Sequence, residues 1–83
     1  MNRDEIRNHL LRILSDIAPE CNPAQIRPAA DLRDQLDLDS LDFQRYVIRV
    51  HEQLHVDIPD RAYQRFTTLD GAVDYLAESQ STA

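Results

Sequence analysis

Residues 36–42 read Leu36-Asp37-Leu38-Asp39-Ser40-Leu41-Asp42, and a helix is predicted to begin within this stretch, near Ser40. Asp39 is a suitable N-cap, because its carboxylate can accept a hydrogen bond from a backbone N–H of the first turn. Asp42 stands three residues later, in the position of the far side of a capping box. The pattern predicts that the helix runs to about His55, before Asp57-Ile58-Pro59 ends it.

The helix predicted from residue 40 to 55 has two apolar faces. At about 100° per residue, four of its residues form a narrow stripe that is expected to face the core. These four are Phe43, Val47, Val50 and Leu54. Two aliphatic and two charged residues fall on nearly the opposite side: Leu41, Ile48, Arg45 and Glu52. Periodicity leaves two interpretations open, namely surface aliphatics without a role or a docking face in which apolar contacts are ringed by charge.

The sequence before this helix predicts one more helix and a long loop. Apolar residues at helical spacing predict an amphipathic helix over residues 3–17, and Asn2 is its expected N-cap. Pro19, Pro23 and Pro28 exclude a continuous helix through residues 18–30. A long loop is therefore expected between the first two helices.

Two further helices are predicted in the last third of the chain. Residues 60–66 allow a short helix, and Thr67 or Thr68 is expected to cap a final one. The buried stripe of the final helix is predicted to be Leu69, Ala72, Val73, Leu76 and Ala77. We therefore expect an all-α fold of three longer helices and one short helix. Residues 1–78 are expected to form a single domain and residues 79–83 a frayed polar tail.

Composition excludes several classes of protein. A chain of 83 residues supports one small core and no deep, walled active site. Its single Gly excludes a Gly-rich phosphate loop, and its nine basic residues are all Arg, which excludes lysine chemistry. The net charge of −6 disfavours nucleic acid as a partner and favours basic proteins.

The sequence predicts neither a membrane span nor a signal peptide. No stretch approaches the roughly 20 apolar residues of a membrane span, and Asp4 and Glu5 stand where a signal peptide needs an apolar run. The single cysteine, Cys21, excludes an internal disulfide and fits a reducing compartment. We expect a cytoplasmic monomer that is not inserted in a membrane.

Two sequence features that resemble reactive sites, an H-E-x-x-H match and Cys21, are interpreted as having no chemical role. The segment from His51 to His55 matches the zinc motif H-E-x-x-H, but a catalytic zinc needs a third protein ligand. Ile58 and Arg61 occupy the positions where the metzincin continuation requires Gly and His. Cys21 has no His or basic residue close in sequence that would stabilise a thiolate. We therefore expect neither a zinc hydrolase nor a reactive thiol.

Ser40 is the remaining candidate for chemistry. Its hydroxyl is predicted to project from a helix start between Asp39 and Asp42, and the simplest interpretation is a structural capping serine. The sequence offers no base with an orienting partner, and the chain is too small to build an oxyanion hole, so Ser40 is not a self-activated nucleophile. An exposed hydroxyl can still be modified by another enzyme, and the two carboxylates can then be read by a basic partner.

Three blocks of this sequence resemble the acyl carrier protein family. Residues 36–42 resemble its attachment motif, with Asp39-Ser40-Leu41 at the centre. The second block is Val56-Asp57-Ile58-Pro59-Asp60, and the third, at the last helix, consists of Phe66-Thr67-Thr68-Leu69 and Ala72-Val73-Asp74-Tyr75-Leu76. It covers nearly the whole chain, with the three blocks in the expected order and spacing.

The resemblance implies a four-helix bundle in which Ser40 carries a covalent 4′-phosphopantetheine arm from coenzyme A. A phosphopantetheinyl transferase, which uses magnesium, would attach the arm, and acyl-loading and acyl-processing enzymes would use its thiol to hold acyl groups as thioesters. The chain itself would be a carrier without catalytic activity or a metal site. The positions that partners read would be Asp39, Leu41 and Asp42, together with the outward residues Arg45, Ile48 and Glu52.

Two positions depart from the family's pattern. Asp37 stands where the family often has Gly, at a loop position that tolerates a positive φ. Arg45 and Arg49 lie on a helix whose outward face is strongly acidic in housekeeping fatty-acid carriers. The leading hypothesis is therefore a discrete acyl carrier protein of a specialised lipid or secondary-metabolite pathway. The alternatives are a carrier of aminoacyl or polyketide intermediates and an unmodified adaptor with the carrier fold.

Overall fold

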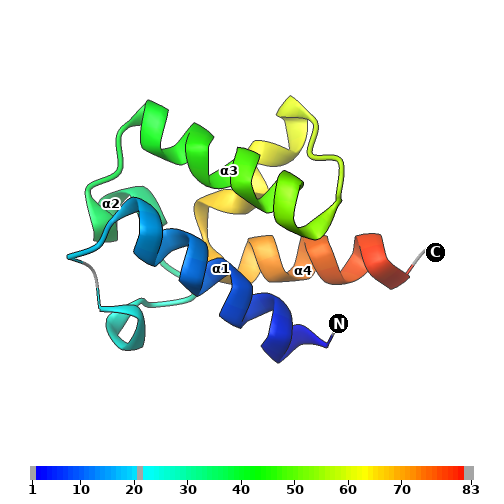
Figure 1. Cartoon of the computed structure of the whole chain (residues 1–83), viewed down its shortest axis with the longest axis horizontal. Coiled ribbons are helices and arrows are strands. Elements are labelled where there is room, and N and C mark those ends of the chain that lie inside the picture. The colour runs from blue at the N-terminus through cyan, green and yellow to red at the C-terminus, as the bar shows by residue number, and fades with distance from the viewer. Residues whose placement is uncertain (1, 21, 82–83) are drawn as a thin grey trace.

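The computed structural model describes residues 2–20 and 22–81. Over these residues the fold consists of helices and connecting segments without a strand, as the sequence predicts (Figure 1). The three longer helices are α1 (Arg3–Ile17), α3 (Ser40–Leu54) and α4 (Leu69–Ser81). The shorter elements are α2 (Leu32–Leu36) and the 3₁₀ segments η1 (Pro23–Gln25) and η2 (Asp60–Thr67).

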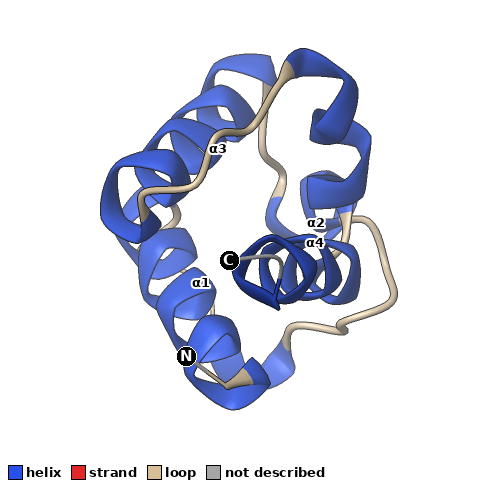
Figure 2. Cartoon of the chain, turned by 90° about the vertical axis from the view of Figure 1, so that its right-hand side faces the viewer, coloured by secondary structure: helices blue, strands red, loops and turns tan. Residues whose placement is uncertain are grey.

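Helix α1 packs against both α3 and α4, and η2 packs against α4. In the view along α4, the other helices surround a shared interior (Figure 2). The two chain ends lie on the same side of the bundle, where Arg3 of α1 forms an ion pair with Asp74 of α4 (Figure 1). This arrangement gives the chain one continuous core.

The core contains both predicted stripes. The four residues expected to face inward from α3 are all buried, as are Leu69, Ala72, Val73 and Leu76 of α4, whereas Ala77 is only partly buried. Two large aromatic residues outside these stripes, Tyr46 and Phe66, are also fully buried. Their rings continue a row in which neighbouring centroids lie 5.6–6.3 Å apart, namely Tyr63, Phe43, Tyr46, Phe66 and Tyr75. Edge-to-face contacts of this kind add to the energy of burial.

The predicted helix starts are confirmed by their hydrogen bonds. The side chain of Asn2 accepts from the N–H of Glu5 at 2.8 Å, and Asp39 accepts from the N–H of Asp42 at 2.8 Å. Of the two threonines considered as caps for α4, Thr68 accepts from the N–H of Gly71 at 3.0 Å. Each bond satisfies a backbone donor that the helix itself leaves free.

Helix α2 was not expected from the sequence, which predicted no helix between residue 17 and the helix start near Ser40. It begins where Asp31 accepts from the N–H of Arg33 at 2.8 Å, and its Leu32 is fully buried. It ends at Asp37, which adopts a left-handed conformation with φ of 54°. A helix of five residues presents too few turns for its periodicity to be recognised.

The expected long loop between α1 and α2 is held by side-chain and backbone contacts. The Gln35 amide accepts from the N–H of Arg27 and donates to the carbonyls of Arg27 and Ala30. The carbonyl of Pro28 accepts from the N–H of Asp70 at 3.0 Å, which ties the loop to the start of α4. The loop therefore has a defined path across the bundle.

The end of the chain differs from the expectation in one respect. Helix α4 continues to Ser81, so residues 79–81 of the predicted frayed tail are helical, whereas residues 82–83 lie outside the described residues. A short polar segment has no periodicity that marks where the helix stops. In the described part of the chain, none of the helices combines the length and apolar character that a membrane crossing requires.

Gly71 is required by the close packing of α4 on η2. A Cβ at this position would lie 2.3 Å from the carbonyl oxygen of Arg65 and 2.9 Å from Oγ1 of Thr68. We predict that Gly71→Ala lowers the free energy of unfolding by about 1–3 kcal/mol, because the clash outweighs the gain of about 1 kcal/mol in helix propensity. Urea titration of both proteins measures this difference, and an equal or higher stability of the variant would contradict the packing argument.

The Tyr46 hydroxyl is buried without a hydrogen-bond partner among the described residues, and burial raises the pKa of this group far above its usual value. An unpaired buried hydroxyl costs about 1–3 kcal/mol. We therefore predict that Tyr46→Phe, which keeps the ring, leaves the free energy of unfolding unchanged or raises it by about 1 kcal/mol. Tyr75→Phe is the matched control, because the Tyr75 hydroxyl donates to the carbonyl of Asp57 at 3.0 Å. A larger loss in Tyr46→Phe than in the control would show that the Tyr46 hydroxyl is satisfied.

Candidate functional site

Ser40 is the first residue of α3 and is exposed to solvent. The preceding residue, Asp39, has extended backbone geometry and caps the helix through Asp42. Because Asp39 provides the cap, the Ser40 side chain is not needed for that purpose. The hydroxyl therefore stands at a helix N-terminus, where the helix dipole and free N–H groups favour negative charge.

The loop before Ser40 is anchored on both sides. Leu38 is buried in the core two residues before Ser40. The carbonyl of Arg33 accepts from the N–H of Asp37 and, at 3.1 Å, from the N–H of Leu38. These contacts fix the path of the chain from α2 to α3 and hold Ser40 on the surface.

A shallow hollow of about 480 Å³ adjoins Ser40. Apolar surface is supplied by the rings of Phe43 and Tyr63, which meet edge to face at 6.3 Å. The remaining lining residues carry charged or hydrogen-bonding groups: Arg33, Gln44, Gln64 and Thr67. A hollow of this size and mixed character can accept a slender amphipathic chain that is attached to Ser40.

The outward side of α3 exposes both aliphatic residues that periodicity placed there. The exposed fraction is 55% for Leu41 and 43% for Ile48, and these are the large hydrophobic residues that the described chain exposes. Arg45 and Glu52 are exposed beside them. We call Leu41, Arg45, Ile48 and Glu52 the outward face of α3.

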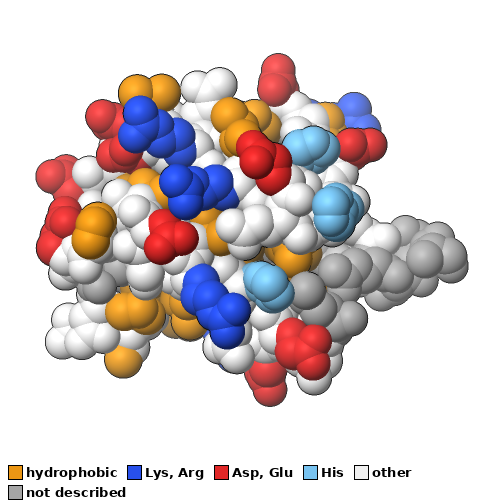
Figure 3. Space-filling model, viewed as in Figure 1, with side chains coloured by type: hydrophobic (Ala, Val, Ile, Leu, Met, Phe, Trp, Pro, Cys, Tyr) orange, Lys and Arg blue, Asp and Glu red, His pale blue; other side chains and the backbone are white. Residues whose placement is uncertain are grey.

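The charges around the outward face are mixed. Figure 3 shows basic, acidic and hydrophobic side chains interleaved over the middle of this side of the molecule, with acidic side chains gathered at its left edge. Arg49 lies 3.6 Å from the Asp16 carboxylate of α1, whereas no ion pair is formed by Arg45 within the described residues. Arg45 is thus the cation available to a partner on this face.

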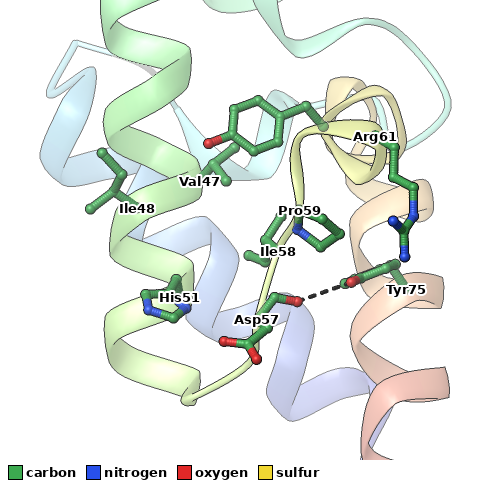
Figure 4. A pocket seen from close by; sticks show the side chains of 9 residues that line it. Val47, Ile48, His51, Asp57, Ile58, Pro59, Arg61 and Tyr75 are labelled. Carbon is green, nitrogen blue, oxygen red and sulfur yellow. Dashed lines mark hydrogen bonds between the residues drawn. The ribbon is translucent and has the colours of Figure 1, made fainter.

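A second hollow, of about 610 Å³, lies farther along α3 (Figure 4). It is lined by Val47, Ile48 and His51 of α3 and by Ile58 and Pro59 of the segment after the helix, and Ile48 lies on the side of α3 that points away from this segment (Figure 4). A hydrogen bond from the Tyr75 hydroxyl of α4 to the Asp57 carbonyl ties this segment to α4 (Figure 4). The hollow extends the outward face, since Ile48 belongs to both.

The two histidines of the H-E-x-x-H match contact the backbone at the C-terminal end of α3. His55 adopts a left-handed conformation with φ of 55°, and its N–H donates to the carbonyl of His51 at 3.0 Å. The Nδ1 atom of His51 lies 2.8 Å from the carbonyl oxygen of Val56. No group of three or more His, Cys, Asp or Glu side chains able to hold a metal ion occurs in residues 2–20 and 22–81. Cys21 lies outside the described residues.

The structure brings the predicted residues of the candidate site together at α3. Asp39, Ser40 and Asp42 share the start of α3, and the outward face follows from there along the helix. Sequence reasoning missed the residues that form the hollow beside Ser40, above all Arg33 and Tyr63. Arg33 is the one basic residue in the acidic segment 31–42, and this contrast was the signal that could have identified it.

Comparison with known proteins gives a consistent result over the whole chain. The family described as "Phosphopantetheine attachment site" matches residues 8–76. The acyl carrier protein of Rubrobacter xylanophilus is 32% identical over 98% of this chain and 99% of its own length. The acyl carrier protein of Acidothermus cellulolyticus is 30% identical over 100% of this chain and 98% of its own length.

A mitochondrial protein is also similar to this chain in sequence, and a solved structure is similar to it in fold. The mitochondrial acyl carrier protein of Neurospora crassa is 29% identical over 92% of this chain and 57% of its own length. The structure of an acyl carrier protein from Enterococcus faecalis shares the fold, with a TM-score of 0.80 and 23% identity over 95% of this chain and 99% of that one. The matches of sequence and of fold agree, and the chain belongs to the acyl carrier protein family and contains its phosphopantetheine attachment domain.

Proposed function

We propose that this protein is a discrete acyl carrier, formed by residues 1–78, in which Ser40 carries the 4′-phosphopantetheine arm. The observation that carries the proposal is the exposed Ser40 hydroxyl at the start of α3, in a chain of the phosphopantetheine attachment family. The hollow beside Ser40 leaves room for an amphipathic chain, which supports the fit of the arm to this position.

The residues at the start of α3 have distinct parts in the attachment step. The oxygen of Ser40 bonds to the β-phosphorus of coenzyme A, the bond to 3′,5′-ADP breaks, and the hydroxyl proton passes to the transferase. Asp39 and Asp42 stay on the surface beside Ser40, where they can pair with basic residues of the transferase. When attached, the arm supplies a thiol that holds acyl groups as thioesters.

The carrier itself is proposed to have no catalytic activity. The residues that line the hollow beside Ser40 include no His, Asp or Glu, so the hollow itself supplies no base with an orienting partner of the kind that activates a nucleophilic serine. Partner enzymes would supply the chemistry, and the protein would present the arm to them. We infer that it acts as a monomer in the cytoplasm.

The pathway is proposed to be a specialised one, and the charge of the outward face supports this. Client enzymes that use acidic carriers would present basic residues toward α3, and Arg45 would meet them as a like charge. Arg49 is already paired with Asp16, so Arg45 is the main source of repulsion. The protein's own clients would present a less basic surface.

Attachment at Ser40 is tested by intact mass after incubation with coenzyme A and a broad-range phosphopantetheinyl transferase. We predict that the wild type gains one phosphopantetheinyl group and that Ser40→Ala gains none. Ser40→Ala should fold normally, because Asp39 provides the cap of α3. Ser15→Ala on α1 is the matched control and should be modified like the wild type. A modified Ser40→Ala protein would refute the assignment of Ser40, and an unmodified wild type would favour an adaptor.

Partner choice is tested with acyl-loaded protein and a housekeeping ketosynthase. We predict that Arg45→Glu raises kcat/KM by about tenfold, because one like-charge contact is replaced by an attractive one. Adding Arg49→Ala should change this value little, since Arg49 is held by Asp16. The control is Arg12→Glu, which makes the same charge change at an exposed position of α1.

Two results would count against the specialised pathway. One is a wild type that already works as well as the housekeeping carrier, and the other is an equal gain in Arg12→Glu, which would make net charge the cause. Loading by the transferase is measured in parallel for every variant. The carrier assignment stands or falls on that loading and not on the ketosynthase.

A further inference from the structure

Ser40 lies in an unusually acidic part of the chain. Residues 31–42 contain five Asp and one basic residue, Arg33. A phosphodiester on Ser40 would add a further negative charge to this segment. The helix N-terminus offsets part of the repulsion, but Arg33 is the one side chain of opposite charge that lines the same hollow as Ser40.

Arg33 is held close to Ser40 by both its backbone and its side chain. Its carbonyl is bonded to the N–H groups that lead into α3, as described above. Its guanidinium carbon lies 5.7 Å from the centroid of the Phe43 ring, within the range of a cation–π contact. Its Nε atom lies 3.7 Å from the Asp31 carboxylate, and about half of the side chain is exposed. The charge is therefore oriented on the aromatic floor and still accessible from the hollow.

The hollow also suits the rest of the arm. Pantetheine carries a branched apolar carbon next to a hydroxyl, followed by two amides. Phe43 and Tyr63 present apolar surface, and Gln44 and Gln64 present amide groups that can donate and accept. The Thr67 hydroxyl donates to the Gln64 carbonyl at 2.7 Å and keeps lone pairs for an amide N–H.

We propose that Arg33 is a positioning residue, which pairs with the phosphodiester on Ser40 and holds the arm in a resting position across this hollow. The planar guanidinium suits two oxygens of one phosphate, which a lysine could not engage in the same way. The inference rests on the proposed attachment to Ser40. It adds a docked state of the arm, from which a client enzyme would have to lift it.

The test uses full-length protein carrying the arm without any acyl group, after its mass has shown complete attachment. Four proteins are compared: wild type, Arg33→Ala, Arg33→Lys and Arg12→Ala. The first readout is the ³¹P chemical shift of the phosphodiester, with the urea-unfolded protein as the reference for a free arm. The second readout is the set of NOEs between the methyl groups of a ¹³C-labelled arm and the rings of Phe43 and Tyr63.

In the wild type, the ³¹P shift should differ from the unfolded reference and approach it as NaCl is raised, because salt screens an exposed ion pair. In Arg33→Ala, the shift should move toward the reference, and the ratio of docked to free arm should fall about two- to fivefold. Arg33→Lys should lie between these proteins, and Arg12→Ala should match the wild type.

Equal ³¹P shifts and equal NOEs in wild type and Arg33→Ala would overturn the proposal. It would also be overturned if the two proteins differ only after the arm is loaded with an acyl group that bears a carboxylate, because Arg33 would then recognise the cargo. Failure of the attachment to Ser40 is a separate result, since it would appear earlier as a missing mass gain and a missing ³¹P resonance.

Discussion

The packing of one face of α3 against the rest of the bundle is the constraint on which the other features depend. Phe43, Val47, Val50 and Leu54 are buried, and Tyr46 links them to Phe66 in the row of aromatic rings. A helix that buries this face has no freedom to rotate, since rotation would expose the apolar stripe to water. Burial of these residues therefore also determines which side chains of α3 reach solvent.

The exposed features of the protein follow from that orientation. Ser40 stands at the free N-terminus of α3, and Leu41, Arg45 and Ile48 lie outward along the helix. A side chain that a partner enzyme modifies or reads has to stand out from a rigid support. The same packing that stabilises the bundle thus presents Ser40, the proposed attachment residue, next to the residues proposed to select partners.

The acidic loop before α3 shows how a small domain combines charge with order. Its carboxylates would repel one another in a free chain, but Asp31 and Asp39 each accept a backbone hydrogen bond as helix caps. Leu32 and Leu38, which lie between these two aspartates in the sequence, are buried in the core and anchor the segment there. Alternation of capping carboxylates and buried leucines keeps the loop in place, and it also brings Arg33 to the hollow beside Ser40.

Local sequence alone determined the longer helices, their caps and the inward and outward faces of α3, because these depend on periodicity and on neighbours within one turn. The motif around Ser40 also made this residue the candidate for attachment. Tertiary structure decided what depends on contacts between distant segments. It placed Tyr63 of η2 against Phe43 to form the hollow, and it paired Arg49 with Asp16 so that Arg45 remains available. Such pairs are 20 and 33 residues apart in the chain, and no local pattern encodes which of them meet, because packing of the whole core sets the distances between helices.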